Sequence, residues 1–424
     1  MSVQPGRLGA AFLAEVEAAL APADALLSER YPGDDGSRQP VHTVYVPADR
    51  YSADLAREWG RTALETAAEH GGLDAIARAT VARTDSTATE LATLVEAKLR
   101  TEPIEDLRVD FEDGYGVRAD DEEDAAVAAA VAAIRDSGDS SPPFLGIRFK
   151  CFEADVRARG LRTLDLFVSG LADTGDLPAG LTLTLPKVTS TDQVAAMVTV
   201  ARELERVHGL PDGRIGFEIQ VETPQSVMGI DGSAPVAKMI HAGEGRVTAL
   251  HYGTYDYSAS LGIAAAYQSM EHPAADHAKA VMQLAAAGTG VRLSDGSTNI
   301  LPVGDREAVE AGWALHSRLV RRHLERGFYQ GWDLHPAQLV TRFLATYAFY
   351  RDGFDSAAER LRNYAHQITS SVLDEPATAR ALAGFIRRGE VCGALTVDEV
   401  ETATDLPIAK VRELALHRPP APSN

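Results

Sequence analysis

Short runs of β-branched, leucine and aromatic residues alternate along this chain with longer stretches rich in Ala, Leu, Glu and Arg. Each short run has the length and composition of a strand buried in a sheet. We take these runs to be apolar on both faces, as strands of a parallel sheet are when helices cover both sides. The predicted strands span residues 42–47, 107–111, 144–149, 181–187, 214–222, 246–252, 290–293 and 328–334.

The stretches between these runs have the composition of helices. Strands that alternate with helices indicate an α/β fold with a parallel sheet. Eight strands favour a closed (β/α)8 barrel, a TIM barrel, over the competing topology, a doubly wound open sheet. The predicted helices span residues 53–69, 125–134, 192–207, 274–287 and 306–326.

Two regions lie outside the alternating pattern. The N-terminal segment is predicted to form a helix followed by a loop of Gly, Asp, Ser and Pro. After Pro336 we expect helix to about Gly389, then a short acidic region and a disordered Pro-rich tail. We therefore divide the chain into an N-terminal helix and loop (1–40), a TIM-barrel domain (41–340) and a C-terminal helical region (341–424).

The charge of the chain narrows the range of its partners. The 424 residues are 45% hydrophobic and 24% charged, as in ordinary globular proteins, and carry a formal net charge of −20. Such an acidic chain lacks the basic surface that neutralises phosphates, so we expect neither nucleic acid nor an anionic membrane as a partner. Local arginines and a metal ion can still attract an anionic substrate into a pocket.

Cysteine content and apolar runs bear on the compartment. Cys151 and Cys392 are far apart and offer neither a disulfide framework nor a zinc-binding spacing, which favours a reducing compartment. Glu15 and Glu17 fall where a signal peptide requires its apolar core, and the longest apolar run, 125–134, is too short to cross a bilayer. We therefore expect a cytoplasmic protein.

Charged residues gather where five consecutive predicted strands end, whereas P-loop, GxGxxG, HExxH and GxSxG motifs are absent from the sequence. In a barrel these strand ends face one mouth, where active sites lie. Singly, each has a structural explanation, such as a helix cap for Asp113, an ion pair for Arg148 or an exposed strand end for Lys187. Together they indicate a shared ligand site, because burying unpaired charge is costly. In strand order, the residues are Glu112 and Asp113, then Arg148, Lys187, Glu222 and Asp256.

Glu222 and Asp256 would approach each other from neighbouring strands. Two carboxylates, with water and substrate completing an octahedron, are the usual way to hold Mg²⁺, with Mn²⁺ as the alternative. The set contains no Cys or His group, so a hard cation fits better than zinc. A 2-oxo acid could chelate the metal, which would stabilise an enolate as a Lewis acid. Arg148 would then bind the substrate carboxylate or the enolate oxygen.

Short motifs in a fixed order connect the sequence to a known superfamily. They are VYVP at 44–47, DFED at 110–113, LPKV at 185–188, VETP at 221–224, GTYDYSASLG at 253–262 and LHPAQ at 334–338. In these motifs the chain resembles the citrate lyase β-subunit superfamily, which includes malyl-CoA and citramalyl-CoA lyases and 4-hydroxy-2-oxoheptanedioate aldolases. Malate synthases are more distant relatives with related chemistry.

The resemblance implies a TIM-barrel enzyme that cleaves or forms a carbon–carbon bond of a small hydroxy or oxo acid, or of its CoA thioester, through an enolate. It also implies a homo-oligomer, either a trimer or a hexamer, and Mg²⁺ bound by Glu222 and Asp256. The other implied site residues are Arg148, Glu112, Asp113 and Lys187 as catalytic residues, with Glu112 and Asp113 beside the metal's water ligands, and Arg148, Gly253, Thr254 and Pro224 as substrate contacts.

Some features depart from the family pattern. Tyr257 stands where leucine usually follows the metal aspartate, and no clear CoA-binding signature is present. The general base is unplaced: His42, His251 and His335 are candidates because histidine titrates near neutral pH, and a base from a neighbouring subunit is the alternative. Two other functions stay open. One is a malate-synthase-like condensation of an acyl-CoA with glyoxylate, which the helical C-terminal region favours, and the other is a non-catalytic ligand-binding barrel.

Overall fold

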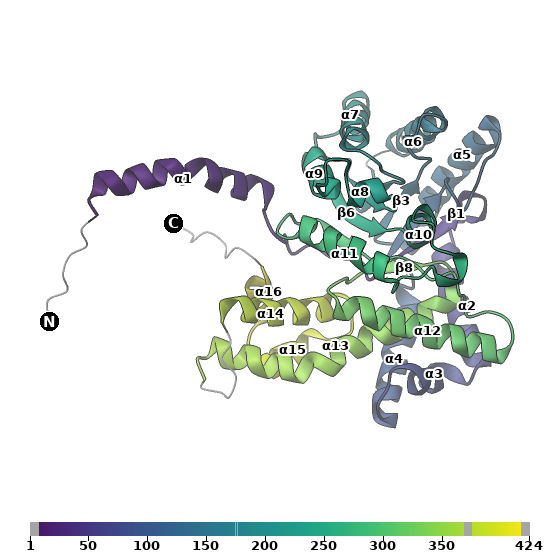
Figure 1. Ribbon diagram of the computed structural model, residues 1–424. Helices are drawn as coiled ribbons and strands as arrows, with labels where there is room; N and C mark the ends of the chain where they lie inside the picture. The colour runs from purple at the N-terminus through teal and green to yellow at the C-terminus, as the bar shows by residue number, and fades with distance from the viewer. Residues whose placement is uncertain (1–7, 174, 176, 369–374, 417–424) are drawn as a thin grey trace.

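The computed structural model describes residues 8–173, 175, 177–368 and 375–416 (Figure 1). Its centre is a parallel barrel with the strand order β7-β6-β5-β4-β3-β2-β1-β8. The barrel closes where Ser294 pairs with Gln330 and the Asp295 amide donates to the Gln330 carbonyl at 2.9 Å. The (β/α)8 prediction is confirmed. The strands are β1 (His42–Pro47), β2 (Asp106–Asp110), β3 (Phe144–Arg148), β4 (Leu181–Leu185), β5 (Phe217–Val221), β6 (Val247–Tyr252), β7 (Arg292–Ser294) and β8 (Gly331–Asp333).

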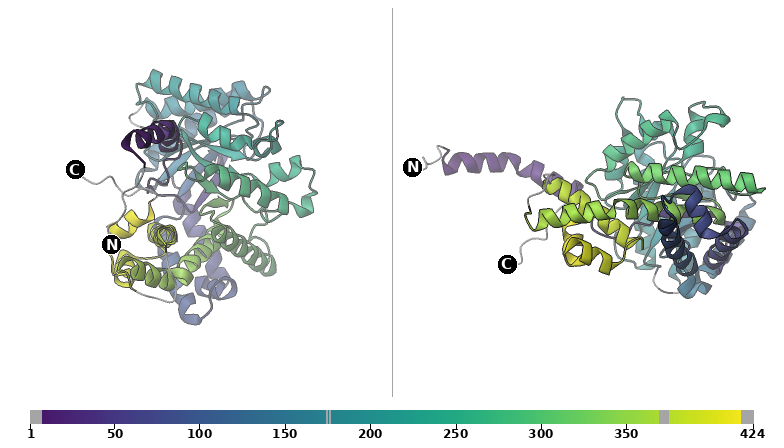
Figure 2. Two further views of the ribbon diagram at one scale, coloured as in Figure 1. Left: turned by 60° about the vertical axis from the view of Figure 1, so that its left-hand side comes forward. Right: turned by 90° about the horizontal axis from the view of Figure 1, so that it is seen from below.

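Helices connect the strands and surround the barrel (Figures 1 and 2). Several of them, including α3, α4 and α6, are missing from the predicted set. In α6 the two glycines lower helix propensity, but a Cβ on Gly160 would lie 2.2 Å from the carbonyl oxygen of Lys150. Gly160 therefore lets α6 pack closely on the chain after β3. The helices of this part are α2 (Leu55–Glu69), α3 (Gly72–Thr80), α4 (Asp85–Thr101), α5 (Asp120–Asp136), α6 (Arg157–Ala172), α7 (Thr191–His208), α8 (Pro224–Val227), α9 (Pro235–Ala242), α10 (Thr254–Ser260), α11 (Pro273–Ala286) and α12 (Arg306–Glu325), with short 3-10 helices at Ala48–Arg50, Gly138–Ser140 and Ala265–Tyr267.

The interior of the barrel is polar, so the prediction that the strands are apolar on both faces is wrong. In strands such as β4 and β5, every second residue belongs to the hydrophobic core, as Leu183 and Ile219 do. The residues at the intervening positions of the strands point into the barrel. Arg108 on β2 donates to Glu218 on β5 at 2.8 Å, and this contact crosses the interior because β2 and β5 are not neighbours. His251 Nε2 lies 3.0 Å from the same Glu218 carboxylate. The buried charges are thus paired, as charges in a protein interior must be.

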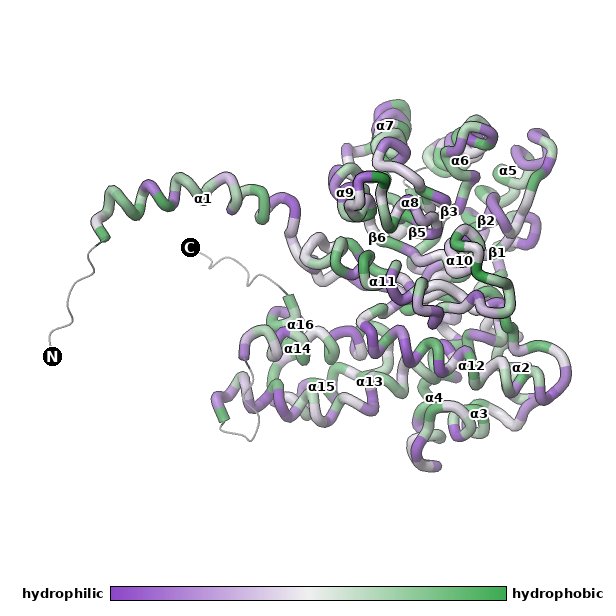
Figure 3. Tube along the Cα trace, viewed as in Figure 1, coloured by the Kyte–Doolittle hydropathy of each residue, from purple (hydrophilic) through white to green (hydrophobic). Residues whose placement is uncertain are grey.

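The N-terminal helix α1 (Ala10–Arg30) projects from the body of the molecule, and none of its residues is buried (Figures 1 and 2). Hydrophobic residues occur along its length (Figure 3); the exposed fractions of Phe12, Leu20 and Leu27 are 50%, 53% and 55%. No helix in the described part of the chain, α1 included, is long and apolar enough to cross a bilayer.

The C-terminal helices pack around a second hydrophobic core, which includes Phe354, Leu361, Ile386 and Val411. The prediction of helix to about Gly389 agrees with α14, which ends at Val391. The acidic segment that follows forms another helix, which begins with a capping box between the Thr396 and Glu399 side chains and backbone amides. The predicted Pro-rich tail lies outside the described residues. The helices are α13 (Pro336–Ala365), α14 (Pro376–Val391), α15 (Val397–Thr404) and α16 (Ile408–Ala415).

Candidate active site

The charged residues predicted from the sequence meet at one end of the barrel. Strands β2 to β6 are consecutive neighbours, so their carboxyl ends share one sector of the mouth. The residues are Glu112 and Asp113 in the loop after β2, Arg148 at the end of β3, Lys187 just after β4, Glu222 directly after β5 and Asp256 in the first turn of α10.

Lys187 is the cation at the centre of this group. Its Nζ lies 2.8 and 2.7 Å from the two carboxylate oxygens of Asp113, contacts Glu112 Oε1 and is 3.8 Å from Asp256 Oδ2. Its backbone amide donates to Glu222 Oε1 at 2.8 Å. Lys187 has a φ of 50°, in the left-handed region that residues other than glycine rarely adopt. Contacts to carboxylates through both the amide and the ammonium group hold this conformation in place.

Glu222 is buried, with 1% of its surface exposed. Burial, together with the charge of Asp256, raises the pKa of Glu222 to about 8, although Lys187 and Arg148 oppose the shift. Gly253 provides the space for this side chain, because a Cβ there would lie 2.3 Å from Glu222 Oε2. The position of Glu222 thus depends on glycine at residue 253.

The mouth holds more negative than positive charge. Burial raises the pKa of Glu112 to about 7, against the opposing charges of Arg148 and Lys187. Burial also raises the pKa of Asp256, with Lys187 opposing and Asp113 reinforcing the shift. The raised pKa values mean that the positive charge nearby is too small to let all of these neighbouring acids ionise without a cost in free energy. A bound cation would supply that charge.

Arg148 is fixed in place by Asp110, the last residue of β2. Its Nε and Nη2 donate to the two carboxylate oxygens of Asp110 at 2.7 and 2.6 Å, and the guanidinium lies 4.9 Å from the ring centre of Tyr45. Among the described residues, Nη1 has only a longer ion pair, at 3.5 Å from Glu112 Oε2. Arg148 can therefore offer Nη1 to a ligand while Asp110 fixes its orientation.

The donor set fits a hard divalent cation in an open site. Within the described residues, no cluster of three or more His, Cys, Asp or Glu side chains has the spacing of a metal cage. Mg²⁺ does not require one, because it keeps several waters and binds through one or two carboxylates and substrate oxygens. Glu222 and Asp256 supply oxygen donors of this kind, and the excess of negative charge around them favours a cation.

Besides Arg148, three further residues were predicted to contact the substrate, and they lie beside Glu222 or just after β6. Pro224 begins α8, two residues after Glu222, and Gly253 lies against the Glu222 side chain. Thr254 is buried, and its hydroxyl donates to the Ser297 carbonyl at 3.1 Å. The Thr254 hydroxyl thus holds the loop after β7.

The three candidate histidines all have structural partners. His42 Nδ1 lies 2.7 Å from Asp333 Oδ2. His251 lies inside the barrel, where its Nδ1 accepts from the Trp332 indole at 3.0 Å. His335 caps the first turn of α13. Each histidine therefore uses at least one ring nitrogen to hold the fold, and the general base stays unassigned.

The sequence matches the family described as "Domain of unknown function (DUF6986)" over residues 20–419. The chain belongs to this family. No curated protein matches the DUF6986 chain in sequence.

Solved structures similar to the DUF6986 chain include malate synthase from Haloferax volcanii as a lead(II) complex, at 16% identity over 89% of both chains with a TM-score of 0.49. The CitE protein of Mycobacterium tuberculosis, in complex with magnesium, acetoacetate and coenzyme A, is 18% identical over 84% of this chain and 100% of its own, with a TM-score of 0.48. The HpcH/HpaI aldolase from Desulfitobacterium hafniense DCB-2 is 15% identical over 75% of this chain and 92% of its own, with a TM-score of 0.38. At these identities and scores, the likeness assigns no activity to the DUF6986 chain.

Asp110 is the residue of the DUF6986 site that sequence reasoning underrated, since it appeared only as part of a motif. Besides Arg148, it accepts from the amides of Glu112 at 3.0 Å and Gly114 at 2.8 Å, so it shapes the loop that carries Glu112 and Asp113. Its position two residues after Arg108 places it on the same inward face of β2. That alternation is the sequence signal that could have revealed it.

Proposed function

We propose that the protein is a Mg²⁺-dependent carbon–carbon lyase or aldolase that cleaves or forms a small hydroxy or oxo acid, or its CoA thioester, through an enolate. The observation that carries this proposal is the excess of carboxylates over cations at the mouth, beside an arginine with one nitrogen to offer. The ordered motifs between residues 44 and 338 support the same function.

In this proposal, Glu222 and Asp256 hold the metal, which is Mg²⁺ with Mn²⁺ as the alternative. The bound ion supplies Lewis-acid stabilisation of negative charge on the substrate oxygens. Lys187 keeps Glu112 and Asp113 in place through its ammonium group. Those two carboxylates then orient the water molecules of the mouth.

Arg148 binds the substrate carboxylate through Nη1. Rotation of the guanidinium would break two charge-assisted hydrogen bonds to Asp110, so the donor is oriented before the substrate arrives. Pro224 and Gly253 bound the space beside Glu222 and limit the size of the group that fits there. Thr254, next to Gly253, holds this part of the site in place through its hydrogen bond to the loop after β7.

The test is calorimetric titration of metal-stripped protein with Mg²⁺ or Mn²⁺, with and without oxalate, pyruvate and glyoxylate. Oxalate resembles the pyruvate enolate, so we expect it to bind only when metal is present. Asp256→Ala should abolish this binding. Glu203→Ala is the matched control, because Glu203 is an exposed acid of α7 whose ion pair is with Arg206, three residues along the same helix. Absence of metal-dependent oxalate binding in the wild-type protein would refute the lyase and favour a non-catalytic ligand-binding barrel.

A malate-synthase-like condensation of an acyl-CoA with glyoxylate is the second candidate. The observation that favours it is the helical C-terminal region with its own core, which simple aldolase barrels do not need for closure. Release of free thiol on mixing acetyl-CoA, glyoxylate and Mg²⁺ with the protein would select this reaction. No thiol release, together with cleavage of a hydroxy-oxo acid, would select the aldolase.

A further inference from the structure

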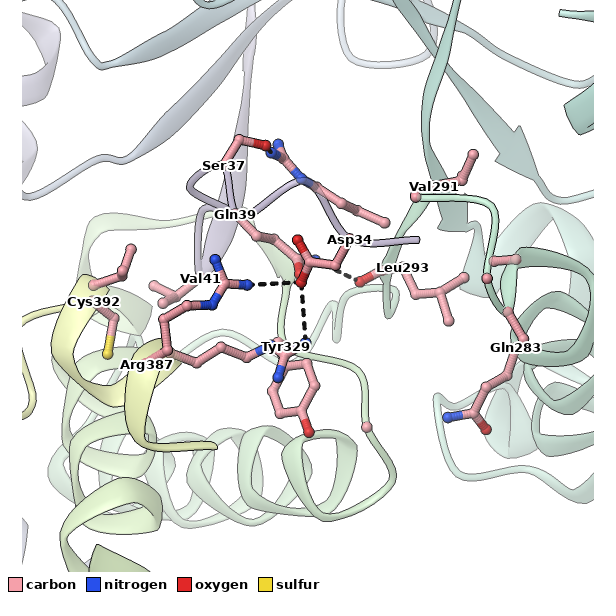
Figure 4. Close-up of a pocket in the computed structure, with 18 of the residues that line it drawn as sticks. Asp34, Ser37, Gln39, Val41, Gln283, Val291, Leu293, Tyr329, Arg387 and Cys392 are labelled. Atoms are coloured by element: carbon pink, nitrogen blue, oxygen red, sulfur yellow. Dashed lines mark hydrogen bonds and ion pairs between the residues drawn. The ribbon is translucent and has the colours of Figure 1, made fainter. Parts of the chain in front are cut away.

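A cavity of about 280 Å³ lies where the chain enters β1, β7 and β8, at the opposite end of the barrel from the acidic mouth. Figure 4 shows residues that line it. Its walls are residues 34–41 before β1, residues 286–293 leading into β7, Tyr329 before β8, and α14 of the C-terminal region. The first two walls are tied together, because the Gly33 amide donates to the Gly288 carbonyl at 2.8 Å and the Gln39 side chain donates to the Leu293 carbonyl at 3.1 Å. The cavity is thus formed by segments that are distant in sequence but held in fixed positions.

Positive charge dominates the lining. Arg387 is buried, with 7% of its side chain exposed, and it donates to Asp34 Oδ2 at 2.7 Å, while its Nε has no partner among the described residues. Arg388 lies 3.8 Å from the same oxygen and 4.2 Å from the ring centre of Tyr329. Asp34 is the one acid among the lining residues.

Arg292 adds a third guanidinium from the start of β7. It is half-buried and donates to the Ser37 hydroxyl, and no carboxylate of the described residues lies within ion-pair distance of it. Burial lowers the pKa of Arg292, and the more distant charges of Asp35 and Asp34 offset this only in part. Three guanidinium groups therefore share one carboxylate in a partly desolvated space, an imbalance that costs free energy until an anion enters.

The chemistry of the lining defines the ligand. Guanidinium groups match phosphate oxygens in bidentate geometry, and a phosphate dianion that displaces Asp34 offsets two of the three guanidinium charges, one more than Asp34 does. The lining also includes the apolar or aromatic side chains of Val291, Leu293, Tyr329 and Tyr350, which suit an organic group. We propose that this cavity binds a small organic phosphate, whose phosphate group contacts Arg292, Arg387 and Arg388 and displaces Asp34.

Asp34 provides a specific test of the proposed phosphate site. As an internal anion, it competes with the ligand for Arg387 and Arg388. Removal of the Asp34 charge should therefore strengthen phosphate binding. If Asp34 had only a structural role, its removal would not strengthen the binding of any anion. A bound ligand would also join the segment before β1 to α14, so it should raise the melting temperature of the full chain.

The test is calorimetric titration of the full-length, metal-free protein with inorganic phosphate and with ribose 5-phosphate, at constant ionic strength set by chloride. We expect both to bind, with Asp34→Asn tightening binding at least threefold and Arg292→Gln weakening it at least tenfold. Arg388→Gln, at a half-buried position of α14, should weaken binding as well and serves if Arg292→Gln fails to fold by circular dichroism. Glu222→Gln, at the other end of the barrel, should bind both probes as the wild type does, which separates this site from the proposed catalytic mouth.

The opposite results would overturn the proposal. These are no binding of either phosphate by the wild-type protein, binding that Arg292→Gln and Arg388→Gln leave unchanged, or binding that is lost in Glu222→Gln. Binding of malonate without binding of phosphate would also overturn it, because the cavity would then be a dicarboxylate site.

Discussion

Gly253→Ala tests whether the position of Glu222 matters to ligand binding. Gly253 has a φ of −97°, which alanine adopts without strain, so the effect of the substitution is steric. The new Cβ would lie 2.3 Å from Glu222 Oε2 and 2.4 Å from Glu222 Cβ, whereas ordinary contacts begin at 3.4 Å. The buried Glu222 side chain must therefore shift by about 1 Å to make room.

The size of the expected effect follows from this shift. Misplacing a binding group by about 1 Å typically costs a factor of about 100, equivalent to about 2.8 kcal/mol of binding free energy. We expect Gly253→Ala to weaken metal-dependent oxalate binding by about this factor. The overpacking should lower the free energy of unfolding by about 1–3 kcal/mol, which leaves a folded protein.

Two measurements separate these effects: calorimetric titration with Mg²⁺ and oxalate, and urea unfolding followed by circular dichroism. Gly9→Ala is the matched control, because a Cβ at Gly9 meets no atom within 4 Å and its φ of −78° also suits alanine. The control should bind and unfold as the wild type does. If Gly253→Ala is folded and binds metal and oxalate with wild-type affinity, Glu222 is not a metal ligand in this position.

Three further predictions concern stability and assembly. Asp333→Asn should lower the free energy of unfolding by about 3–5 kcal/mol in urea, because fully buried Asp333 pairs with an arginine and two histidines; an unchanged midpoint would contradict this. Burial opposes ionisation of Glu102, but hydrogen bonds from Arg38 and Lys98 prevail and lower its pKa to about 2. Its folded-state pKa lies below the ordinary 4.5, so its contribution of about 3 kcal/mol is present above pH 4.5 and is lost as the pH falls towards 2. Unfolding titrations should therefore show a shallower loss of stability over this range in Glu102→Gln than in the wild type, and parallel curves would count against the assignment. Deletion of residues 1–30 should reduce a homo-oligomer to smaller species in sedimentation velocity, because α1 exposes apolar side chains along its length. The same number of subunits per particle with and without residues 1–30 would exclude α1 from assembly.

The barrel could be predicted because its signals are local. Each strand is a short apolar run between helical stretches, and the count of eight points to closure. The grouping of Glu112, Arg148, Lys187 and Glu222 also followed, since residues at the ends of neighbouring parallel strands must share one mouth. The polar interior was equally readable in LTLTL at 181–185 and FEIQV at 217–221, where every second residue is polar. The expectation of two apolar faces concealed it.

Other features depend on contacts that sequence spacing does not reveal. Nothing near Lys187 in the sequence indicates a left-handed backbone, because carboxylates that follow β2 and β5, and one from α10, hold that conformation. Gly160 reads as a helix breaker until its approach to the carbonyl of Lys150 is known. The cavity at the opposite end of the barrel from the mouth brings together Asp34, Arg292 and Arg387, which are distant in the chain and belong to no common motif.

The two ends of the barrel carry opposite imbalances of charge, and the interior between them explains why the imbalances do not cancel. Arg108 and Glu218 form a buried pair across the barrel, and His251 is within 3.0 Å of the same carboxylate. Because these charges already pair with one another, none of them is available to the acids at the mouth or to the arginines of the cavity at the other end. A substitution that balanced the charge at either end would have to place a new charged side chain in a buried position with matching geometry. A bound ligand supplies the balancing charge from solution. In the two proposals, a metal ion at the mouth and a phosphate in the cavity at the other end of the barrel would relieve two separate costs independently. Their binding free energies should therefore be additive, so that saturation with Mg²⁺ and oxalate leaves phosphate binding unchanged.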